Sequence, residues 1–141
     1  MVNYPPKNIY TIYRGRSFTA EWYYAENGKM PAYEFYKQMD AVLRSRFLIL
    51  VQHLAEASYG TFLPKTEYNI EDRTHGIYAF KPHSARFFNF MTKGKKIIVT
   101  NAFSKHSQQL TRQDKEKLKV AIKYSQDYKA RCKRGDYYEK S

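Results

Sequence analysis

Two strand-like runs joined by a short glycine turn constrain the fold more than any other part of the sequence. Residues 86–91 (RFFNFM) and 96–103 (KIIVTNAF) are rich in Phe, Ile and Val, which favour strands. Residues 93–95, Lys-Gly-Lys, join them as a tight turn. A connection this short predicts that the two runs pair as an antiparallel hairpin. Residues 76–81 (GIYAFK) form a further strand candidate just before them.

A helical pattern precedes this sheet. Pro31 is well placed as the first residue of a helix, since its missing N–H would have no partner there. Apolar residues then recur at steps of three and four, the period of one buried helical face: Phe35, Met39, Leu43, Phe47, Leu50, Leu54 and Ala57. The pattern ends at Gly60, a plausible C-terminal cap. It fits one long helix or two helices broken near Asp40 or Ser45.

A final helix is expected to begin near Thr111, whose hydroxyl can cap free backbone N–H groups, with Asp114 three residues on. Its apolar stripe is narrow, and the remaining positions are mostly charged. The stripe consists of Leu118, Ala121, Ile122 and Tyr128.

The N-terminal part is expected to begin with an extended arm over residues 1–8, because Pro5 and Pro6 disfavour helix. Two β-rich runs follow at residues 9–14 and 17–24, and Asn27-Gly28 ends the second with a turn. The sequence therefore predicts a single α+β domain over residues 1–141, with N-terminal helices packed on a small antiparallel sheet and a C-terminal helix. Residues 1–16 are interpreted as an N-terminal extension and residues 131–141 as a basic tail.

Charge points to a polyanionic partner. Lys and Arg number 25 against 13 acidic residues, a net charge of +12. Residues 93–141 carry 14 basic and 5 acidic residues, whereas residues 1–92 carry 11 and 8. A concentrated positive field favours nucleic acid, because neutralising phosphates releases their condensed counterions. The alternatives are a solvated basic helix and a membrane-surface patch.

Several classes of protein find no support. The longest apolar block, residues 47–51 (FLILV), is too short to span a bilayer, and the N-terminus has no apolar signal-peptide core, so we expect a cytoplasmic protein with no membrane partner. A lone Cys132 excludes an internal disulfide and a cysteine-rich zinc site. The four histidines lack zinc-hydrolase spacing, and there is no Gly-rich phosphate loop or GxSxG elbow. We expect neither a metal nor a cofactor.

One group of residues has the composition of a phosphodiester site. Lys81, His83 and Arg86 fall in or beside the first two of the later strands, and Lys105 and His106 directly follow the third. Adjacent antiparallel strands would bring these side chains together. Arg can bind a phosphate through two parallel hydrogen bonds, Lys can neutralise developing charge, and His titrates near neutral pH. No acid partner is apparent in the group. Ordinary solvated strand ends are the alternative.

The order of three segments resembles the toxin superfamily that includes RelE, ParE and HigB, and is most similar to its phage-associated HigB-like branch. The segments are GIYAFKPHSARFFNF, KKIIVTNAFSKHSQQLT and AIKYSQDYKAR, and NGKMPAYEFYKQM is similar to the branch's helix start. The matching positions are Gly76, Tyr78, Arg86, Phe88, Phe103, Lys105, Ser107, Gln108, Ala121, Asp127 and Tyr128. The resemblance covers about residues 17–130. The sequence departs from the branch at Ala79, Lys81, His106 and Thr111, where Glu, Arg, Lys and Pro are common.

The resemblance implies a type II toxin that cleaves mRNA, in relatives often on the ribosome, and that is paired with a small antitoxin, expected to carry a helix-turn-helix. The RNA 2′-hydroxyl would attack its own phosphate, so no metal is required. Arg86 and Lys105 would stabilise the developing charge with support from Lys81, and His106 or His83 would transfer protons. The side chains expected to hold RNA or ribosomal phosphates are those of Arg73, Arg112, Lys115, Lys119, Lys123 and Arg131. The alternatives are a non-catalytic phage-derived nucleic-acid-binding regulator and a ParE-like inhibitor of DNA gyrase.

Overall fold

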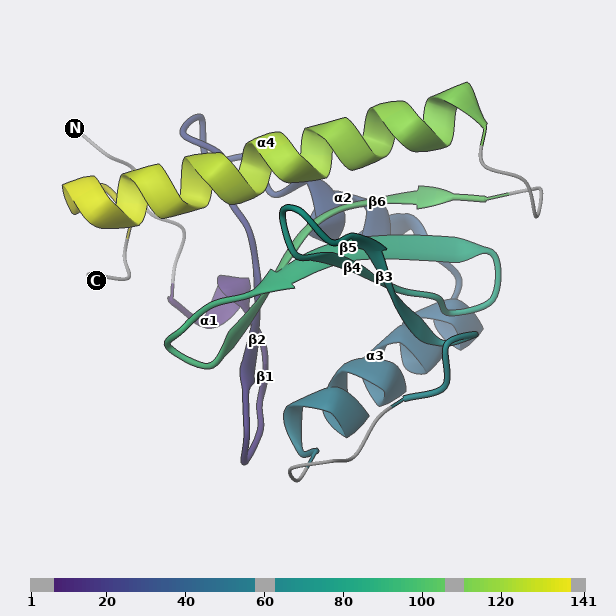
Figure 1. Cartoon of the computed structure of the whole chain (residues 1–141). Coiled ribbons are helices and arrows are strands. Elements are labelled where there is room, and N and C mark those ends of the chain that lie inside the picture. Colours follow the sequence, from purple (N-terminus) through teal and green to yellow (C-terminus); the bar gives the residue numbers. More distant parts are fainter. Residues whose placement is uncertain (1–6, 58–62, 106–110, 138–141) are drawn as a thin grey trace.

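The computed structural model of the chain has a six-stranded mixed sheet with helices on both faces (Figure 1). It describes residues 7–57, 63–105 and 111–137. The elements are α1 (Lys7–Tyr10), β1 (Thr11–Arg14), β2 (Thr19–Trp22), α2 (Pro31–Gln38), α3 (Ala41–Ala55), β3 (Tyr68–Asp72), β4 (Ile77–Phe80), β5 (Ala85–Met91), β6 (Lys96–Ser104) and α4 (Arg112–Arg134). The predicted α+β class with a C-terminal helix is confirmed.

The sheet has the strand order β1-β2-β6-β5-β4-β3. The predicted hairpin is confirmed, since β5 and β6 pair antiparallel from Met91 opposite Ile97 to Ala85 opposite Ser104. One pair departs from the expected antiparallel sheet: β2 runs parallel to β6, so the sheet is mixed. The edge strand β3 is an addition to the predicted strands, because the alternation of Tyr68 and Ile70 with Asn69 and Glu71 is too short to indicate a strand by itself.

Trp22, the last residue of β2, and Tyr23, which follows it, face opposite sides of the sheet. The Trp22 ring lies 5.6 Å from the Phe47 ring of α3, whereas the Tyr23 ring lies 4.6 Å from the Tyr124 ring of α4. Alternation along a strand produces this arrangement. Figure 1 shows the result: α4 lies along one face of the sheet and α3 lies against the other.

The long helical pattern is broken into two helices at Asp40. The Asp40 carboxylate accepts a hydrogen bond from the Leu43 backbone N–H at 2.9 Å and so caps α3. The pattern therefore forms two helices, and the break between them lies at Asp40 and not at Ser45. The expected end at Gly60 is wrong, because α3 ends at Ala55. Gly60 itself lies outside the described residues.

Both ends of the described chain belong to the fold. Residues 11–14 pair with β2, so this part of the expected N-terminal extension is a strand of the sheet. Lys7 and Asn8 begin the short helix α1 where an extended arm was expected. In the expected basic tail, Arg131 and Tyr137 are each 1% exposed and belong to the core.

Helix α4 begins as predicted. Thr111 and Asp114 form a capping box, in which the Thr111 hydroxyl accepts from the Asp114 N–H at 3.1 Å and the Asp114 carboxylate accepts from the Thr111 N–H at 2.9 Å. Gly135 ends the helix with a φ of 80°, a left-handed conformation that costs glycine little.

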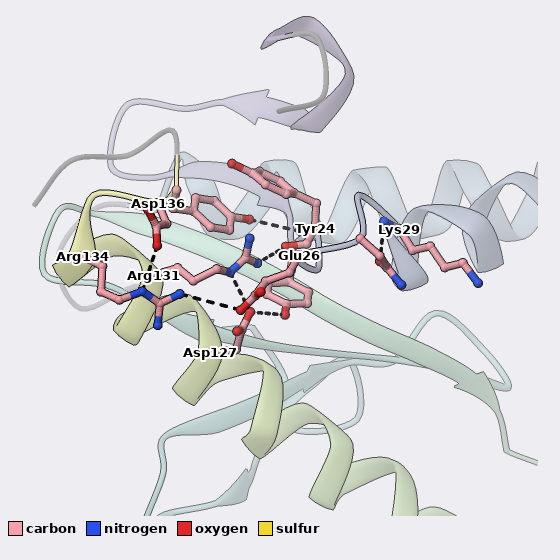
Figure 2. A network of polar contacts seen from close by, with 10 residues as sticks. Tyr24, Glu26, Lys29, Asp127, Arg131, Arg134 and Asp136 are labelled. Carbon is pink, nitrogen blue, oxygen red and sulfur yellow. Dashed lines mark hydrogen bonds and ion pairs between the residues drawn. The ribbon is translucent and has the colours of Figure 1, made fainter. Parts of the chain in front are cut away.

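A buried arginine fixes the C-terminal half of α4 to the segment that directly follows β2 (Figure 2). The Arg131 Nε donates to the Asp127 carboxylate at 2.9 Å, and its Nη2 donates to the Tyr24 carbonyl. The guanidinium lies 4.7 Å from the centre of the Tyr137 ring. The Tyr23 hydroxyl donates to the Asp127 carboxylate at 2.5 Å. Burial is the main cause that raises the pKa of Tyr23, and this hydrogen bond is the second. The expected RNA contact by Arg131 is therefore wrong, because its charge is paired inside the core.

We predict that Arg131→Met lowers the free energy of unfolding by about 3 kcal/mol, because it removes a buried guanidinium that pairs with the half-buried Asp127 and donates to the Tyr24 carbonyl. Urea unfolding measures this change. Arg134→Met is the matched control, since Arg134 is an exposed arginine one turn further along the same helix. If both variants unfold near the midpoint of the parent, the network does not hold α4 in place.

Candidate phosphodiester site

Three cations converge at the end of the sheet where β4, β5 and β6 meet. Arg86 of β5 lies opposite Phe103 of β6. Lys105 follows β6 directly, and its N–H donates to the Ser84 carbonyl at 2.6 Å. Lys81 follows β4, one residue beyond the pairing of Phe80 with Phe87. Strand pairing therefore brings together three of the five predicted catalytic residues, Lys81, Arg86 and Lys105.

A β-bulge in β6 directs Lys105 toward α4. The pairing passes from Asn89 opposite Val99 to Phe88 opposite Asn101, so Thr100 is skipped. Skipping one residue reverses which side chains face each side of the sheet. Beyond the bulge, Asn101 donates to the Lys117 carbonyl of α4 at 3.0 Å, and Lys105 reaches Asp114 of α4.

The cluster has acidic partners, contrary to the sequence-based expectation. The Lys105 Nζ lies 2.7 Å from the Asp114 carboxylate, and the Lys81 Nζ lies 3.5 Å from the Glu71 carboxylate. Two hydrogen bonds hold the pKa of Asp114 below its ordinary value: the one from Lys105 has the larger effect and the one from the Thr111 N–H the smaller. Glu71 was missed because it lies on β3, the strand that the sequence did not indicate. Asp114 was noted only as a helix cap.

Arg86 has the geometry of a phosphate ligand. Its Nη1 donates to the His83 carbonyl at 2.7 Å and to the Ala85 carbonyl at 2.8 Å. Among the described residues these bonds use Nη1 alone, which leaves Nε and Nη2 for a bidentate contact with a phosphate. Burial lowers the pKa of Arg86, and the carboxylates of Glu71 and Asp114 oppose that change. An arginine stays protonated in proteins, so the half-buried guanidinium keeps its charge.

The His83 ring is not part of the cluster. His83 occupies the turn between β4 and β5 with a φ of 54°, and its exposed side chain lines an open groove of about 410 Å³ beside Val42 and Ile49 of α3. Among the described residues, the hydrogen bond between His83 and Arg86 is made by the His83 carbonyl and not by its ring. Sequence spacing placed His83 near Arg86 but could not indicate the direction that a left-handed turn gives its ring. His106, the other predicted histidine, lies outside the described residues.

Phe103 is a candidate site residue that the sequence marked only through the family resemblance. It lies opposite Arg86 in the sheet, and its half-buried ring is 5.5 Å from the Phe88 ring. An aromatic face beside a phosphate-binding arginine can stack a nucleobase. The pairing of the two strands, which the hairpin signal predicted, could have identified it.

The residues predicted to bind RNA fall into three groups. Four are exposed on α4: Arg112, Lys115, Lys119 and Lys123. Arg73 is exposed in the turn between β3 and β4. Arg131 is buried, as described above. The four exposed residues of α4 therefore share one helix, whereas Arg73 comes from a turn of the sheet.

Two other kinds of feature are absent from the described ranges. Among residues 7–57, 63–105 and 111–137, no three His, Cys, Asp or Glu side chains group in a way that could hold a metal ion. In the same ranges no helix combines the length and apolar character needed to cross a membrane.

Comparison with known proteins adds no assignment. No known family's model matches the chain, and no curated protein matches it. The function must therefore be argued from the geometry of the cluster.

We predict that Asp114→Asn destabilises the protein in a pH-dependent way. A carboxylate whose folded-state pKa is depressed stabilises the fold above its unfolded value of about 3.9, and this contribution is lost as the pH falls through the lower folded-state value. Thermal melting should show a lower midpoint for the variant at pH 7 and a shrinking difference from the parent below about pH 3.9.

Glu116→Gln is the matched control, since Glu116 is exposed on the same turn of α4 and does not contact Lys105. A difference between Asp114→Asn and the parent that stays constant from neutral to acid pH would contradict the ion pair.

Proposed function

We propose that this protein is a metal-independent endoribonuclease, a type II toxin of the RelE/ParE/HigB kind. The observation that carries the proposal is the cluster itself: Arg86, Lys105 and Lys81 meet at one end of the sheet, with the half-buried ring of Phe103 opposite Arg86. Cations that bind a phosphate beside a ring that can stack a base suit an RNA backbone better than a protein or a small metabolite.

The chemistry needs only groups of the chain and of the RNA. The 2′-oxygen attacks the adjacent phosphorus, the bond to the 5′-oxygen breaks, and a cyclic phosphate and a free 5′-hydroxyl result. Because DNA lacks the nucleophile, it is spared. In this proposal the Arg86 guanidinium binds two non-bridging phosphate oxygens while Lys105 neutralises charge that develops in the phosphorane. Lys81 supports the same charge from the neighbouring strand.

Two groups are candidates for proton transfer. Glu71 lies beside Lys81, and its carboxylate is close enough to Arg86 to affect that residue's pKa. His106 follows Lys105 directly in the sequence. A general base takes the 2′-hydroxyl proton and a general acid protonates the leaving 5′-oxygen, so both groups can take part.

The proposal includes a cytoplasmic location, mRNA on the ribosome as the substrate and a small helix-turn-helix antitoxin as the partner. The net charge of +12 supports these polyanionic and acidic partners. A second candidate function is non-catalytic binding of RNA. The pairing of Lys105 with Asp114 favours it, because a lysine held by a carboxylate can serve structure alone.

We predict that Arg86→Ala and Lys105→Ala each reduce cleavage of an RNA oligonucleotide by at least about a hundredfold, the scale of losing one donor to a transition-state oxyanion. Both variants should keep the circular dichroism spectrum of the parent. The controls are Arg14→Ala, an exposed cation of the edge strand β1, and Lys93→Ala, an exposed cation in the turn at the opposite end of the β5–β6 hairpin from Arg86. Unchanged cleavage by an Arg86→Ala, Lys105→Ala double variant would show that the site lies elsewhere, and intact RNA with the parent would favour simple binding or an inhibitor of gyrase.

The proton carrier can be identified from pH–rate profiles. If His106 transfers a proton, His106→Lys should lower the rate and flatten its pH dependence near the imidazole pKa of about 6.5. If Glu71 alone is the base, Glu71→Gln should lower the rate and His106→Lys should keep or raise it. A profile that neither substitution changes would exclude both residues as proton carriers.

A further inference from the structure

The outward face of α4 carries a long row of cations. The helix turns every 3.6 residues, so six exposed basic residues lie within about a third of its circumference. We call this surface the α4 stripe, and it consists of Arg112, Lys115, Lys119, Lys123, Lys133 and Arg134. At about 1.5 Å per residue it is about 33 Å long. Figure 1 shows α4 lying along the outside of the sheet as one unbroken helix.

Few acidic residues among those that the structure describes neutralise the α4 stripe. Glu116 is the only exposed acidic residue of α4, and its carboxylate lies 3.5 Å from Lys119 in a solvated pair. At the C-terminal end, Arg134 lies 2.9 Å from Asp136 and 3.7 Å from Glu26. Exposed pairs of this kind contribute little and exchange readily. The stripe therefore keeps most of its charge for an external anion.

The α4 stripe has no ring on which a base could stack. Of the tyrosines of α4, Tyr124 is half-buried against Tyr23, and Tyr128 is buried against Phe90. No Phe, Tyr or Trp side chain of α4 is exposed. Proteins that hold single strands without sequence preference combine cations with exposed rings. Cations alone indicate a ligand that presents phosphates and keeps its bases stacked inside.

Double-helical RNA is such a ligand. Its wide, shallow minor groove presents two rows of phosphates and 2′-hydroxyls on a surface that proteins recognise by shape. A straight, convex helix can lie across this surface, whereas an extended single strand is usually held in a groove. The cations at positions 115, 119 and 123 recur at i and i+4, which aligns them along one line of the helix.

An anionic membrane is a poorer match. Helices that lie on a bilayer place their apolar face among the lipid chains. The apolar face of α4 is packed on the sheet, where Ala121 is fully buried and Tyr128 contacts Phe90. It cannot enter a membrane without leaving the core.

We propose that the α4 stripe binds double-helical RNA through its phosphates, at a surface separate from the cleavage site. The two surfaces adjoin, because Arg112 at the N-terminal end of the stripe is two residues from Asp114, which pairs with Lys105. A duplex on the stripe places a neighbouring single strand at the cluster, so the substrate class is a single-stranded segment next to a helix in a folded RNA. This inference rests on the proposed function only in taking RNA as the polyanion.

The test measures fluorescence anisotropy of a labelled RNA duplex of about 20 base pairs with the full-length protein over a range of salt concentrations. Lys119→Ala with Lys123→Ala should weaken duplex binding and reduce the slope of log K against log salt by about 2, one for each phosphate that the variant no longer neutralises. Arg14→Ala with Lys93→Ala removes the same charge elsewhere and should leave both quantities near those of the parent.

The readouts separate this inference from the proposed function. The Arg86→Ala, Lys105→Ala variant should bind the duplex like the parent even though it does not cleave. Duplex binding that depends on Lys119 and Lys123 supports the inference even if no cleavage is found. Equal losses in the stripe variant and its charge-matched control would overturn it, as would tighter binding of a single strand than of the duplex. Stripe-dependent binding to phosphatidylserine vesicles without duplex binding would also overturn it and indicate a membrane.

Discussion

The contact between Arg131 and the end of β2 determines where α4 lies on the sheet, and the position of α4 determines the candidate site. The apolar stripe of α4 is narrow, so apolar packing alone would tolerate a shift of the helix along the sheet. Hydrogen bonds are more directional than apolar contacts. Arg131, near the C-terminal end of α4, donates to the Tyr24 carbonyl. Nearer the N-terminal end, the Lys117 carbonyl accepts a hydrogen bond from Asn101. These two anchors set the axial position of a rigid helix, and so place Asp114 beside Lys105.

A charge buried this deeply must be matched locally. The Asp127 carboxylate supplies the counter-charge, and the faces of Tyr137, Tyr24 and Tyr23 lie 4.7, 5.3 and 5.7 Å from the guanidinium. Ring faces attract cations, most strongly where water is excluded. The Arg131 Nη1 still has no hydrogen-bond partner among the described residues, so the arrangement is costly. Buried ion pairs of this kind specify one arrangement more than they add stability, which fits a role in fixing the register of α4.

Local signals predicted the local structure of this protein. The hairpin of β5 and β6 followed from its short turn, and the start of α4 followed from Thr111 and Asp114. What could not be predicted depends on contacts between distant residues. The bulge at Thr100 arises from strand pairing, and the acidic partners of the cluster come from an edge strand and from a helix end.

The burial of Arg131 was not predicted from the sequence. It follows Tyr128 by three residues, the spacing of one helical face, so periodicity alone would have placed it near the core. Its charge led to the opposite expectation, because arginine is rarely fully buried without a partner. The partners, Asp127 one turn earlier and the Tyr24 carbonyl, could be recognised only once α4 was placed on β2.

The pairing inside the cluster has a consequence for how an anion would be recognised. Three cations held close together repel one another, and the carboxylates of Asp114 and Glu71 offset that repulsion in the folded protein. A phosphate that binds Lys105 must therefore compete with Asp114, so a single phosphate binds the cluster with little net gain in free energy. Among the described residues the α4 stripe has only exposed ion pairs, with Glu116, Glu26 and Asp136, and its attraction for phosphates acts over a longer range. The stripe therefore provides most of the binding affinity, and the cluster positions the phosphate that reacts. A ligand that contacts both surfaces binds more tightly than one that contacts the cluster alone.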